Sequence, residues 1–498
     1  WAFMPKSLLK NVDTFYQNSQ PKKHISGIDG ALNVWRFQYD DDGDNVLDAA
    51  DPYKTYVYFG LRQGGNEYYM LDISTIASPK IVWHITDQTS GFSELGQAWS
   101  KPAFAKMRLA KNSPENTTHD SELVDVLVFG GGYDPVKNTE NTASVTRAAD
   151  SKGRNVYIVR ADNGELIWSL RDNVTGAAAK LTDSIPGDIR VMDMDRNGAL
   201  DRLYFADTGG RVWRVDMDVD VGDLLPAGAD TFYDYSKARL SEFANVGGTA
   251  VNKRMFFYEP DIALMQHQGK TILTLAIGSG YRTRPLSESD DRFYVFIDRN
   301  PFSPPDSSIF PIQENAKLVS LTNADGTDNT SAIGASKSLL TETTLHGWYY
   351  DLPNTGEKVL APAVTFMNKV IFTTFASAPA SEEGIDPCSA PPNSARAYVL
   401  DLFNGGAAVN LDRKDGDAER SVIAGINEIL DAAQVVFSKP TAADGTACKA
   451  GDCGTQVAEV RIGKMNLPLI DNTNIPLGTN MGDILPRVFW RDELKGTE

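Results

Sequence analysis

The sequence predicts an all-β protein of the β-propeller class, and three observations lead to this prediction. A unit made of a short apolar strand, a Gly-containing turn and a second, aromatic-rich strand ending in Asp recurs five times along the chain. The first strands of these units start roughly 70 to 100 residues apart, and helical periodicity is scarce. Four strands per repeat, rich in Val, Tyr, Phe and Trp, are typical of propeller blades. A β-sandwich fits less well, because the copies resemble one another and the repeated β structure is too long for one sandwich.

Each repeat is expected to contain a first strand, a second strand and a strand that precedes both. The expected first strands are Tyr56–Gly60, Val126–Gly130, Arg202–Ala206, Ile272–Gly278 and Val370–Thr374. The expected second strands are Tyr68–Asp72, Val156–Asp162, Gly209–Asp216, Phe293–Asp298 and Ala397–Asp401. The preceding strands are Ala31–Tyr39, Lys101–Arg108, Asp188–Asp193, Asp261–Gln266 and Ala361–Phe366. Following strands are expected at Ile81–Ile85 and Leu166–Leu170.

Long polar segments separate the strands and are expected to be insertions at blade ends, where loops vary without disturbing the stacked sheets. These insertions are Leu109–Glu122, Asp134–Arg154, Asp218–Lys253 and Asn300–Thr341. Short helices are expected at Pro5–Val12 and Arg420–Gln434. We expect residues 1–498 to form a single domain, with clear blade repeats over about 28–412 and an irregular closing segment over about 413–498.

The termini and the charge limit the class of protein. The chain begins at Trp1 without an initiator Met, and we interpret it as a processed or trimmed piece whose N-terminal part is absent. No apolar run approaches the roughly 18 residues that span a bilayer, so no membrane-spanning segment is expected. The formal charge of −18 argues against a nucleic-acid partner, because phosphate binding requires clustered Lys and Arg.

Cysteine is sparse. Cys448 and Cys453 lie in a Gly-rich stretch whose spacing allows a local disulfide, and free thiols are the equal alternative. Cys388 is then unpaired or bonded to an absent part of the protein. A structural zinc site is not expected, because the five His residues are scattered away from these cysteines.

The segment 193–201 has the spacing of a calcium-binding loop. Calcium prefers six to eight oxygen ligands, and a tight loop supplies them from positions 1, 3, 5 and 9 together with a backbone carbonyl at position 7. The residues at positions 1, 3, 5, 7 and 9 are Asp193, Asp195, Asn197, Ala199 and Asp201. Gly198 permits the sharp turn. Tyr204 stands where an EF-hand needs Glu, and the loop leads directly into a strand, so the site is expected in a β context. The alternative is a solvated Asp/Asn turn.

A second calcium loop is expected at 40–48, with a less regular pattern. The residues at positions 1, 3, 5, 7 and 9 are Asp40, Asp42, Asp44, Val46 (through its carbonyl) and Asp48. Asn45 occupies the turn position, where Asn tolerates a left-handed backbone. A solvated turn is the alternative here too. Both loops lie at the same place in their repeats, between the preceding strand and the next one, which are the first two of the four strands in sequence order. This shared position favours a repeated structural device.

Several strings in the chain resemble the C-terminal domain of the PilY (PilC) family of type IV pilus tip-associated adhesins and biogenesis factors. The strings that carry the resemblance are Trp1–Pro5, Tyr58–Gly65, Tyr68–Asp72, Asp193–Asp201, Arg202–Asp216 and Arg487–Arg491. The resemblance implies a modified propeller of about seven blades and an absent N-terminal half that often carries a von Willebrand A-like module. It also implies Ca²⁺ in the 193–201 loop and a second calcium site in the 40–48 loop.

The same resemblance implies a function. Family members lie at the pilus tip, on the outer surface or in the periplasm during assembly, contact major and minor pilins and the assembly machinery, and oppose retraction. They also support adhesion to host-cell or other surface receptors and twitching motility. The family's Arg-Gly-Asp tripeptide is absent from this chain, so integrin binding is not carried over.

Two other classes of function compete with this interpretation. One is a purely adhesive propeller that binds host glycan or matrix and uses calcium only structurally. The other is a quinoprotein dehydrogenase, because Tyr157–Trp168 resembles the Trp-containing repeat of those enzymes. That family typically stacks its quinone on a vicinal Cys-Cys disulfide, and this chain has no adjacent cysteines, so an enzyme is not expected.

Overall fold

The computed structural model describes residues 1–17, 25–39, 51–110, 121–139, 149–217, 235–248, 254–267, 270–323, 326–329, 344–377, 393–411, 418–437 and 458–467. The chain divides into two compact units. Unit 1 comprises Trp1–Asn141, Val145–Gly209 and Trp213–Ser241; unit 2 comprises Thr142–Ser144, Gly210–Val212 and Glu242–Glu498. A single domain over 1–498 stays a prediction.

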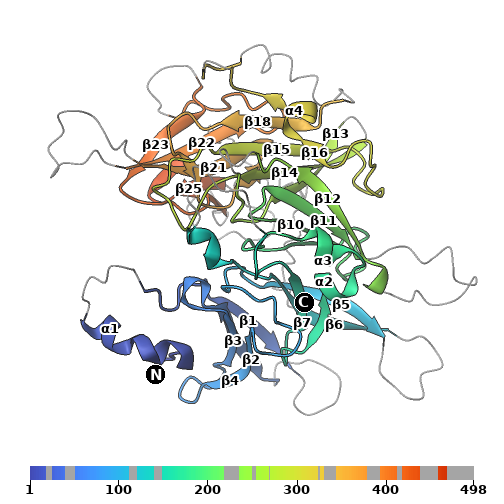
Figure 1. Ribbon diagram of the computed structural model, residues 1–498, viewed down its shortest axis with the longest axis vertical. Coiled ribbons are helices and arrows are strands. Elements are labelled where there is room, and N and C mark those ends of the chain that lie inside the picture. The colour runs from blue at the N-terminus through green and yellow to red at the C-terminus, as the bar shows by residue number, and fades with distance from the viewer. Residues whose placement is uncertain are drawn as a thin grey trace, which may run out of the picture. The chain divides into compact units, whose positions relative to one another are not determined.

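Unit 1 contains two four-stranded antiparallel sheets whose strands follow sequence order (Figure 1). The first sheet has β1 (Asn33–Gln38), β2 (Tyr53–Gly60), β3 (Glu67–Asp72) and β4 (Lys80–Thr86). The second has β5 (Ala103–Ala110), β6 (Ser121–Gly130), β7 (Val156–Arg160) and β8 (Leu166–Ser169). The next strands in sheet order are β9 (Arg190–Met192), β10 (Arg202–Ala206) and β11 (Arg211–Asp216). This up-and-down order is that of propeller blades.

Unit 2 contains larger sheets. One has β13 (Asp261–His267), β14 (Lys270–Gly278), β15 (Arg292–Asp298), β18 (Gly347–Asp351) and β17 (Val319–Ser320). Another has β19 (Lys358–Val359), β20 (Val364–Phe366), β21 (Lys369–Ala376), β22 (Ser394–Asp401) and β23 (Ser421–Ile426). A three-stranded sheet has β24 (Gln434–Phe437), β25 (Ala458–Ile462) and β26 (Met465–Leu467). The end of β12 (Arg239–Asn245) pairs in parallel with β16 (Ile312–Gln313).

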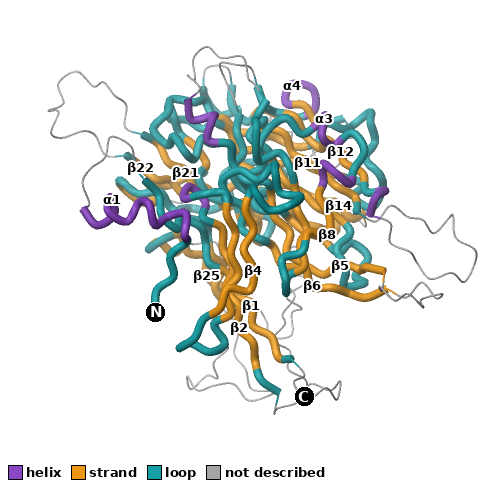
Figure 2. Tube along the Cα trace, turned by 60° about the horizontal axis from the view of Figure 1, so that its bottom comes forward, coloured by secondary structure: helices purple, strands orange, loops and turns teal. Residues whose placement is uncertain are grey.

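The described helices are short, and Figure 2 shows how little of the chain they occupy. The α-helices are α1 (Val12–Gln17), α2 (Leu170–Asn173), α3 (Ala177–Lys180) and α4 (Glu314–Lys317). The 3-10 helices are η1 (Lys6–Asn11), η2 (Arg62–Gly64), η3 (Pro135–Thr139) and η5 (Tyr235–Lys237). Within the described part of the chain, no helix has the length and apolar character needed to cross a membrane.

The predicted fold class is confirmed: the chain is an all-β, modified β-propeller type. The described strands form six sheets, and each of the five predicted repeats falls within one of them. The expected count of about seven blades exceeds these six described sheets. The predicted N-terminal helix is present as η1.

The helix predicted over Arg420–Gln434 is wrong, because that segment forms strand β23 and a loop. β23 pairs antiparallel with β22, and Val422 and Ala424 pack against a buried apolar cluster while Ile423 points outward. This alternation and the β-branched side chains favour a strand once a partner edge is available. Asn427, with a positive φ of 57°, follows the strand.

Several expected insertions and the expected closing segment also contain regular structure. β12 lies within Asp218–Lys253, β16, α4 and β17 lie within Asn300–Thr341, and β24 to β26 lie in the closing segment. These strands are short or pair with residues distant in sequence, so local periodicity does not reveal them.

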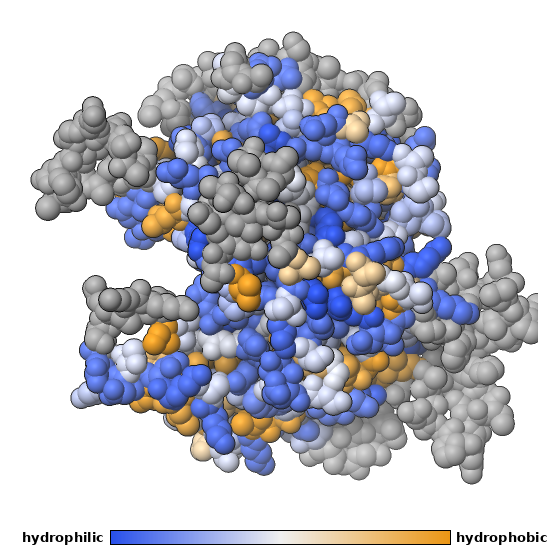
Figure 3. Space-filling view, viewed as in Figure 1, coloured by the Kyte–Doolittle hydropathy of each residue, from blue (hydrophilic) through white to orange (hydrophobic). Residues whose placement is uncertain are grey.

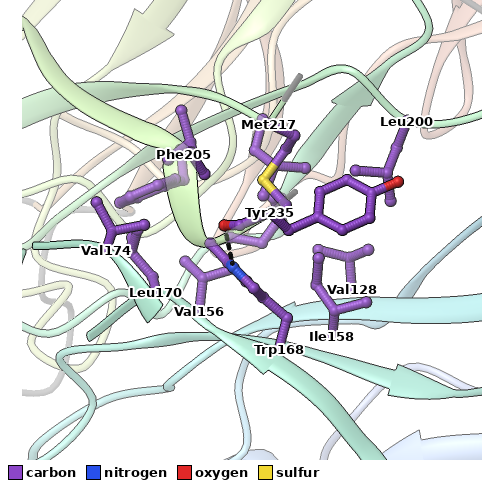
Figure 4. Close-up of a cluster of buried hydrophobic side chains, with 14 of the residues drawn as sticks. Val128, Val156, Ile158, Trp168, Leu170, Val174, Leu200, Phe205, Met217 and Tyr235 are labelled. Carbon is purple, nitrogen blue, oxygen red and sulfur yellow. Dashed lines mark hydrogen bonds between the residues drawn. The ribbon is translucent and has the colours of Figure 1, made fainter. Parts of the chain in front are cut away.

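The sheets pack through their apolar faces. In unit 1, Trp168 sits in a cluster with Val156, Ile158 and Leu203, and its Nε1 donates a 3.2 Å hydrogen bond to the carbonyl of Tyr235 (Figure 4). On the face drawn in Figure 3, hydrophilic residues predominate and hydrophobic residues form small separate groups. In the buried cluster, Trp168 of β8 packs with Leu203 of β10, the strand that directly follows the loop 193–201.

Candidate metal centre

The acidic loop 193–201 connects β9 to β10, two antiparallel neighbours in unit 1. Met192 is opposite Arg202 in the register of this pair, so the loop residues 193–201 close a hairpin. The amide of Asp201 donates a 2.8 Å hydrogen bond to the carbonyl of Met192, which closes the base of the loop. The sequence-based placement between two strands is confirmed.

Two residues turn the loop backbone through the left-handed region. Arg196 has a φ of 68° and Gly198 a φ of 87°. The turn predicted at Gly198 is therefore present. A Cβ built on Gly198 would lie 3.7 Å from Cδ2 of Leu123, an ordinary contact, so the conformation and not lack of space favours glycine there.

The loop brings three carboxylates together. Asp193, Asp195 and Asp201 each place one carboxylate oxygen so that all three oxygens lie within 4.8 Å of one another. Two ligands on opposite sides of a calcium ion are about 4.6 to 5.2 Å apart, because each Ca–O distance is about 2.3 to 2.6 Å. The three carboxylates are therefore spaced to share one cation, and their oxygen chemistry suits a hard dication.

Backbone amides inside the loop hold the first carboxylate. Oδ1 of Asp193 accepts hydrogen bonds from the amides of Arg196 (2.6 Å) and Asn197 (3.1 Å), and Oδ2 accepts one from Gly198 (2.9 Å). Burial and the neighbouring Asp195 raise the pKa of Asp193, although the hydrogen bonds from the amides of Gly198 and Arg196 oppose this effect. The loop thus concentrates negative charge even though its amides partly compensate it.

Asp201 is the most enclosed of the three carboxylates. Its Oδ2 accepts hydrogen bonds from the amides of Met194 and, at 3.2 Å, Asp195. Its Oδ1 is buried and has no hydrogen-bond partner. Burial, together with repulsion from Asp195 and Asp193, raises the pKa of Asp201 to about 6. A buried carboxylate oxygen without a donor is costly, and a cation at this position would remove the cost.

The other two predicted ligands lie in the same loop with different contacts. Asn197 Nδ2 donates a 2.9 Å hydrogen bond to Oδ2 of Asp195, and its Oδ1 accepts one of 2.8 Å from the amide of Ala199. Ala199 is buried. Ligation by the Asn197 side chain and by the Ala199 carbonyl stays a prediction.

The second predicted loop, with ligands Asp40, Asp42, Asp44, Val46 and Asp48, lies outside the described residues. The described strands β1 and β2 that flank it pair antiparallel, and the amide of Tyr39 bonds to the carbonyl of Pro52 at 3.2 Å. The segment 40–48 therefore lies between β1 and β2 in sequence, as the segment 193–201 lies between β9 and β10. This is the equivalent position that was expected for the two loops. Cys388, Cys448 and Cys453 also lie outside the described residues.

A buried ion cluster next to the loop was missed by sequence reasoning. Asp216 Oδ1 accepts hydrogen bonds from Nε of Arg202 (2.7 Å) and Nε of Arg214 (2.9 Å), and both arginines are buried. Arg202 directly follows Asp201, so the cluster fixes the strand that carries the loop. The sequence feature that could have indicated this cluster is the presence of charged residues in β10 and β11, two strands that are otherwise mostly apolar.

Comparisons with known proteins bear on the fold. No protein-family model matches the chain. The crystal structure of the Pseudomonas aeruginosa PilY1 C-terminal domain superposes with a TM-score of 0.54 at 18% sequence identity, over 94% of this chain and 87% of that one. This chain has the fold of a PilY1-type C-terminal domain.

A curated relative agrees with this PilY1-type fold. The type IV pilus biogenesis factor PilY1 homolog of Xylella fastidiosa is 21% identical over 434 residues, which are 82% of this chain. The match spans 25% of the length of that relative. BamB from Moraxella catarrhalis superposes with a TM-score of only 0.29 at 11% sequence identity. The resemblance to the PilY-type C-terminal domain is thus confirmed at the level of the fold.

Proposed function

We propose that this chain is a calcium-binding, non-enzymatic module of a type IV pilus biogenesis factor. It acts outside the cytoplasm at the pilus tip, where it supports extension against retraction, twitching motility and adhesion to surfaces. Its proposed partners are the major and minor pilins, the assembly machinery and a surface receptor. The curated PilY1 homolog supports the pilus role.

One observation carries the calcium part of the proposal: Asp201 has a buried Oδ1 without a hydrogen-bond partner, and one oxygen of its carboxylate lies within 4.8 Å of carboxylate oxygens of Asp193 and Asp195. Calcium accepts oxygen ligands in flexible geometry, whereas Mg²⁺ requires a nearly ideal octahedron and keeps several waters. A nine-residue loop with three carboxylates therefore favours calcium, with micromolar or weaker affinity. Binding orders the loop and stabilises the hairpin that it closes.

Calorimetric titration with CaCl₂ tests the metal. The wild-type chain is expected to bind calcium with a Kd of about micromolar or weaker. Asp201→Asn keeps the shape of the side chain but removes its charge, and we expect at least a tenfold loss of affinity. The exposed Asp162, which lies in a turn outside the loop, provides the matched control, and Asp162→Asn is expected to bind as wild type. Equal binding by Asp201→Asn and wild type would refute the site.

The same two variants, placed in the full-length protein in a strain lacking it, test the role. Loss of surface pili or of twitching with Asp201→Asn, but not with Asp162→Asn, is expected for a calcium-dependent biogenesis factor. Normal pili and twitching with lost attachment would favour the purely adhesive alternative. Wild-type behaviour in all three assays would contradict the proposed dependence on the loop.

A further inference from the structure

A second group of charged side chains is buried in unit 1 and shares no residue with the metal loop. Lys137 lies in η3, and its side chain is only 2% exposed. Its Nζ lies 3.1 Å from Oδ1 of Asp150 and 3.0 Å from Oδ1 of Asp183. Those two carboxylate side chains are 3% and 9% exposed. The chain thus holds one amine between two carboxyl groups in a site that excludes most water.

The two carboxyl groups differ in their other contacts. Oδ2 of Asp150 accepts hydrogen bonds from the amide of Ser184 (2.6 Å) and from Oγ1 of Thr208 (3.2 Å). Two donors on one oxygen, on the side away from the amine, resemble an oxyanion hole that stabilises charge on a tetrahedral intermediate. Asp183 instead accepts a hydrogen bond from Oγ1 of Thr182 at 2.9 Å on its Oδ2. Asp150 is therefore the better electrophile, and Asp183 is placed to accept a proton.

The backbone holds these groups in place. The amide of Asp150 donates a 2.8 Å hydrogen bond to the carbonyl of Thr182, which brings Asp150 beside the segment that carries Asp183 and Ser184. The hydroxyls of Ser184 and Thr208 lie 3.1 Å apart, and both residues are fully buried. Fixed geometry of this kind supplies much of the barrier reduction in intramolecular reactions.

We propose that Lys137 and Asp150 form an intramolecular isopeptide bond, with Asp183 as the proton acceptor. Nζ of Lys137 attacks Cγ of Asp150, the Nζ–Cγ bond forms, and the Cγ–Oδ1 bond breaks. Both protons that the ammonium group loses end on the departing Oδ1, relayed by Asp183, and this oxygen leaves as water. One ammonium and one carboxylate thus give one amide and one water molecule, so the reaction needs no oxidant, reductant or other co-reactant.

Burial favours the uncharged, reactive form of Asp150. One ammonium faces two carboxylates in this site, and a buried charge is costly unless it is paired. Burial raises the pKa of Asp150, even though Lys137 and the Ser184 hydrogen bonds oppose this effect. A neutral carboxyl group is the form that an amine attacks, and transfer of one ammonium proton through Asp183 to Oδ1 of Asp150 gives both reactive forms. Amide formation removes the charges of Lys137 and Asp150 together. The new bond also links η3 covalently to Asp150, in the segment that leads into β7.

Mass spectrometry of the purified chain tests the proposal directly. After complete denaturation, the wild-type chain is expected to be lighter than its sequence mass by one water molecule. Tryptic digestion is expected to leave Lys137 uncleaved and to give a branched peptide that joins Lys137 to Asp150. A wild-type mass equal to the sequence mass, after prolonged incubation of the folded protein, would show an ordinary buried ion cluster and overturn the proposal. A branch to Asp183 would overturn the assigned roles.

Two variants and an internal control separate the reaction from mere proximity. Lys137→Arg keeps the charge but lacks a nucleophilic amine, and Asp183→Asn removes the proton acceptor; both are expected to keep the full sequence mass. Condensation in Asp183→Asn at the wild-type level would contradict the role of Asp183. Lys106, whose Nζ lies 2.6 Å from the half-exposed Asp125, provides the control and is expected in a linear peptide. If either variant fails to fold, the wild-type mass still decides.

Discussion

The backbone amide of Leu200 donates a 2.8 Å hydrogen bond to the carbonyl oxygen of Lys106, which joins the end of the acidic loop to strand β5. The Leu200 side chain is 3% exposed and lies in the same apolar cluster as Trp168 and Tyr235 (Figure 4). The residue directly before Asp201 is therefore fixed by the core of a neighbouring sheet. Order in the loop and packing of that core are expected to depend on each other.

Leu200→Ala is the first test of this coupling. It removes a buried side chain, and we expect the free energy of unfolding to fall by about 2 to 5 kcal/mol. We also expect weaker calcium binding, because the backbone beside Asp201 loses its support. Chemical denaturation and calorimetric titration measure the two effects. Leu32→Ala, at a side chain that is 65% exposed, is expected to change stability by about 0.5 kcal/mol or less and to leave binding unchanged.

Gly198→Ala tests the left-handed turn in the loop. The new Cβ has space, so the expected cost of about 1 to 2 kcal/mol comes from the positive φ alone. The strain falls on a loop that must close around the ion, and a severalfold loss of calcium affinity is expected. Gly198→Asn is expected to recover part of the loss, because Asn tolerates this conformation.

Gly176 offers a matched control for that variant. Its φ is 77° and nothing lies within 4 Å of the position that a Cβ would take, but it lies outside the loop. Gly176→Ala is therefore expected to destabilise the chain by a similar amount without changing the calcium titration. Equal calcium affinity in Gly198→Ala and Gly176→Ala would contradict a role for the Gly198 turn in binding.

The sequence alone predicts what depends on local pattern. Strands such as Arg202–Ala206 are apolar, bounded by turns and paired with strands close in sequence, so their periodicity suffices. The spacing of Asp193, Asp195 and Asp201 is likewise local, and a nine-residue hairpin loop must bring them near one another. The strand β23 was missed because its apolar residues also fit a helix, and only its pairing with β22 decides between the two.

Contacts between distant residues cannot be predicted in this way. Lys137 and Asp183 are 46 positions apart, and nothing near either residue indicates that the other will lie beside it. The unpartnered Oδ1 of Asp201 likewise depends on which amides reach the side chain, not on spacing. The partners of buried charged groups therefore cannot be predicted from local sequence, because they depend on how distant segments pack together.

Asp216→Asn tests the buried ion cluster that supports β10. The substitution keeps the shape of the side chain but removes the negative charge that the buried guanidinium groups of Arg202 and Arg214 both contact. Loss of one partner from a buried ion pair costs about 3 to 5 kcal/mol, and we expect this loss in the free energy of unfolding from chemical denaturation. Asp162→Asn, whose partner Arg160 is 3.7 Å away and partly exposed, is expected to cost about 1 kcal/mol or less. Similar costs for the two variants would contradict the structural role of the cluster.

The raised pKa of Asp201 predicts how calcium and pH act together on stability. Its pKa of about 6 lies above its ordinary value of 3.8, so the folded, calcium-free loop binds a proton more tightly than the unfolded chain does. The contribution of Asp201 to calcium-free stability is therefore fully present below about pH 4 and is lost as the pH rises through about 6. Calcium requires the ionised form, so the rise in Tm caused by calcium is expected to be full above about pH 7 and to shrink as the pH falls through 6.

Thermal unfolding with calcium and with excess chelator, across this pH range, measures the difference. In Asp201→Asn the residual calcium effect is expected to be small at every pH, and a wild-type calcium effect that stays constant from pH 7 to pH 5 would contradict the assigned coupling.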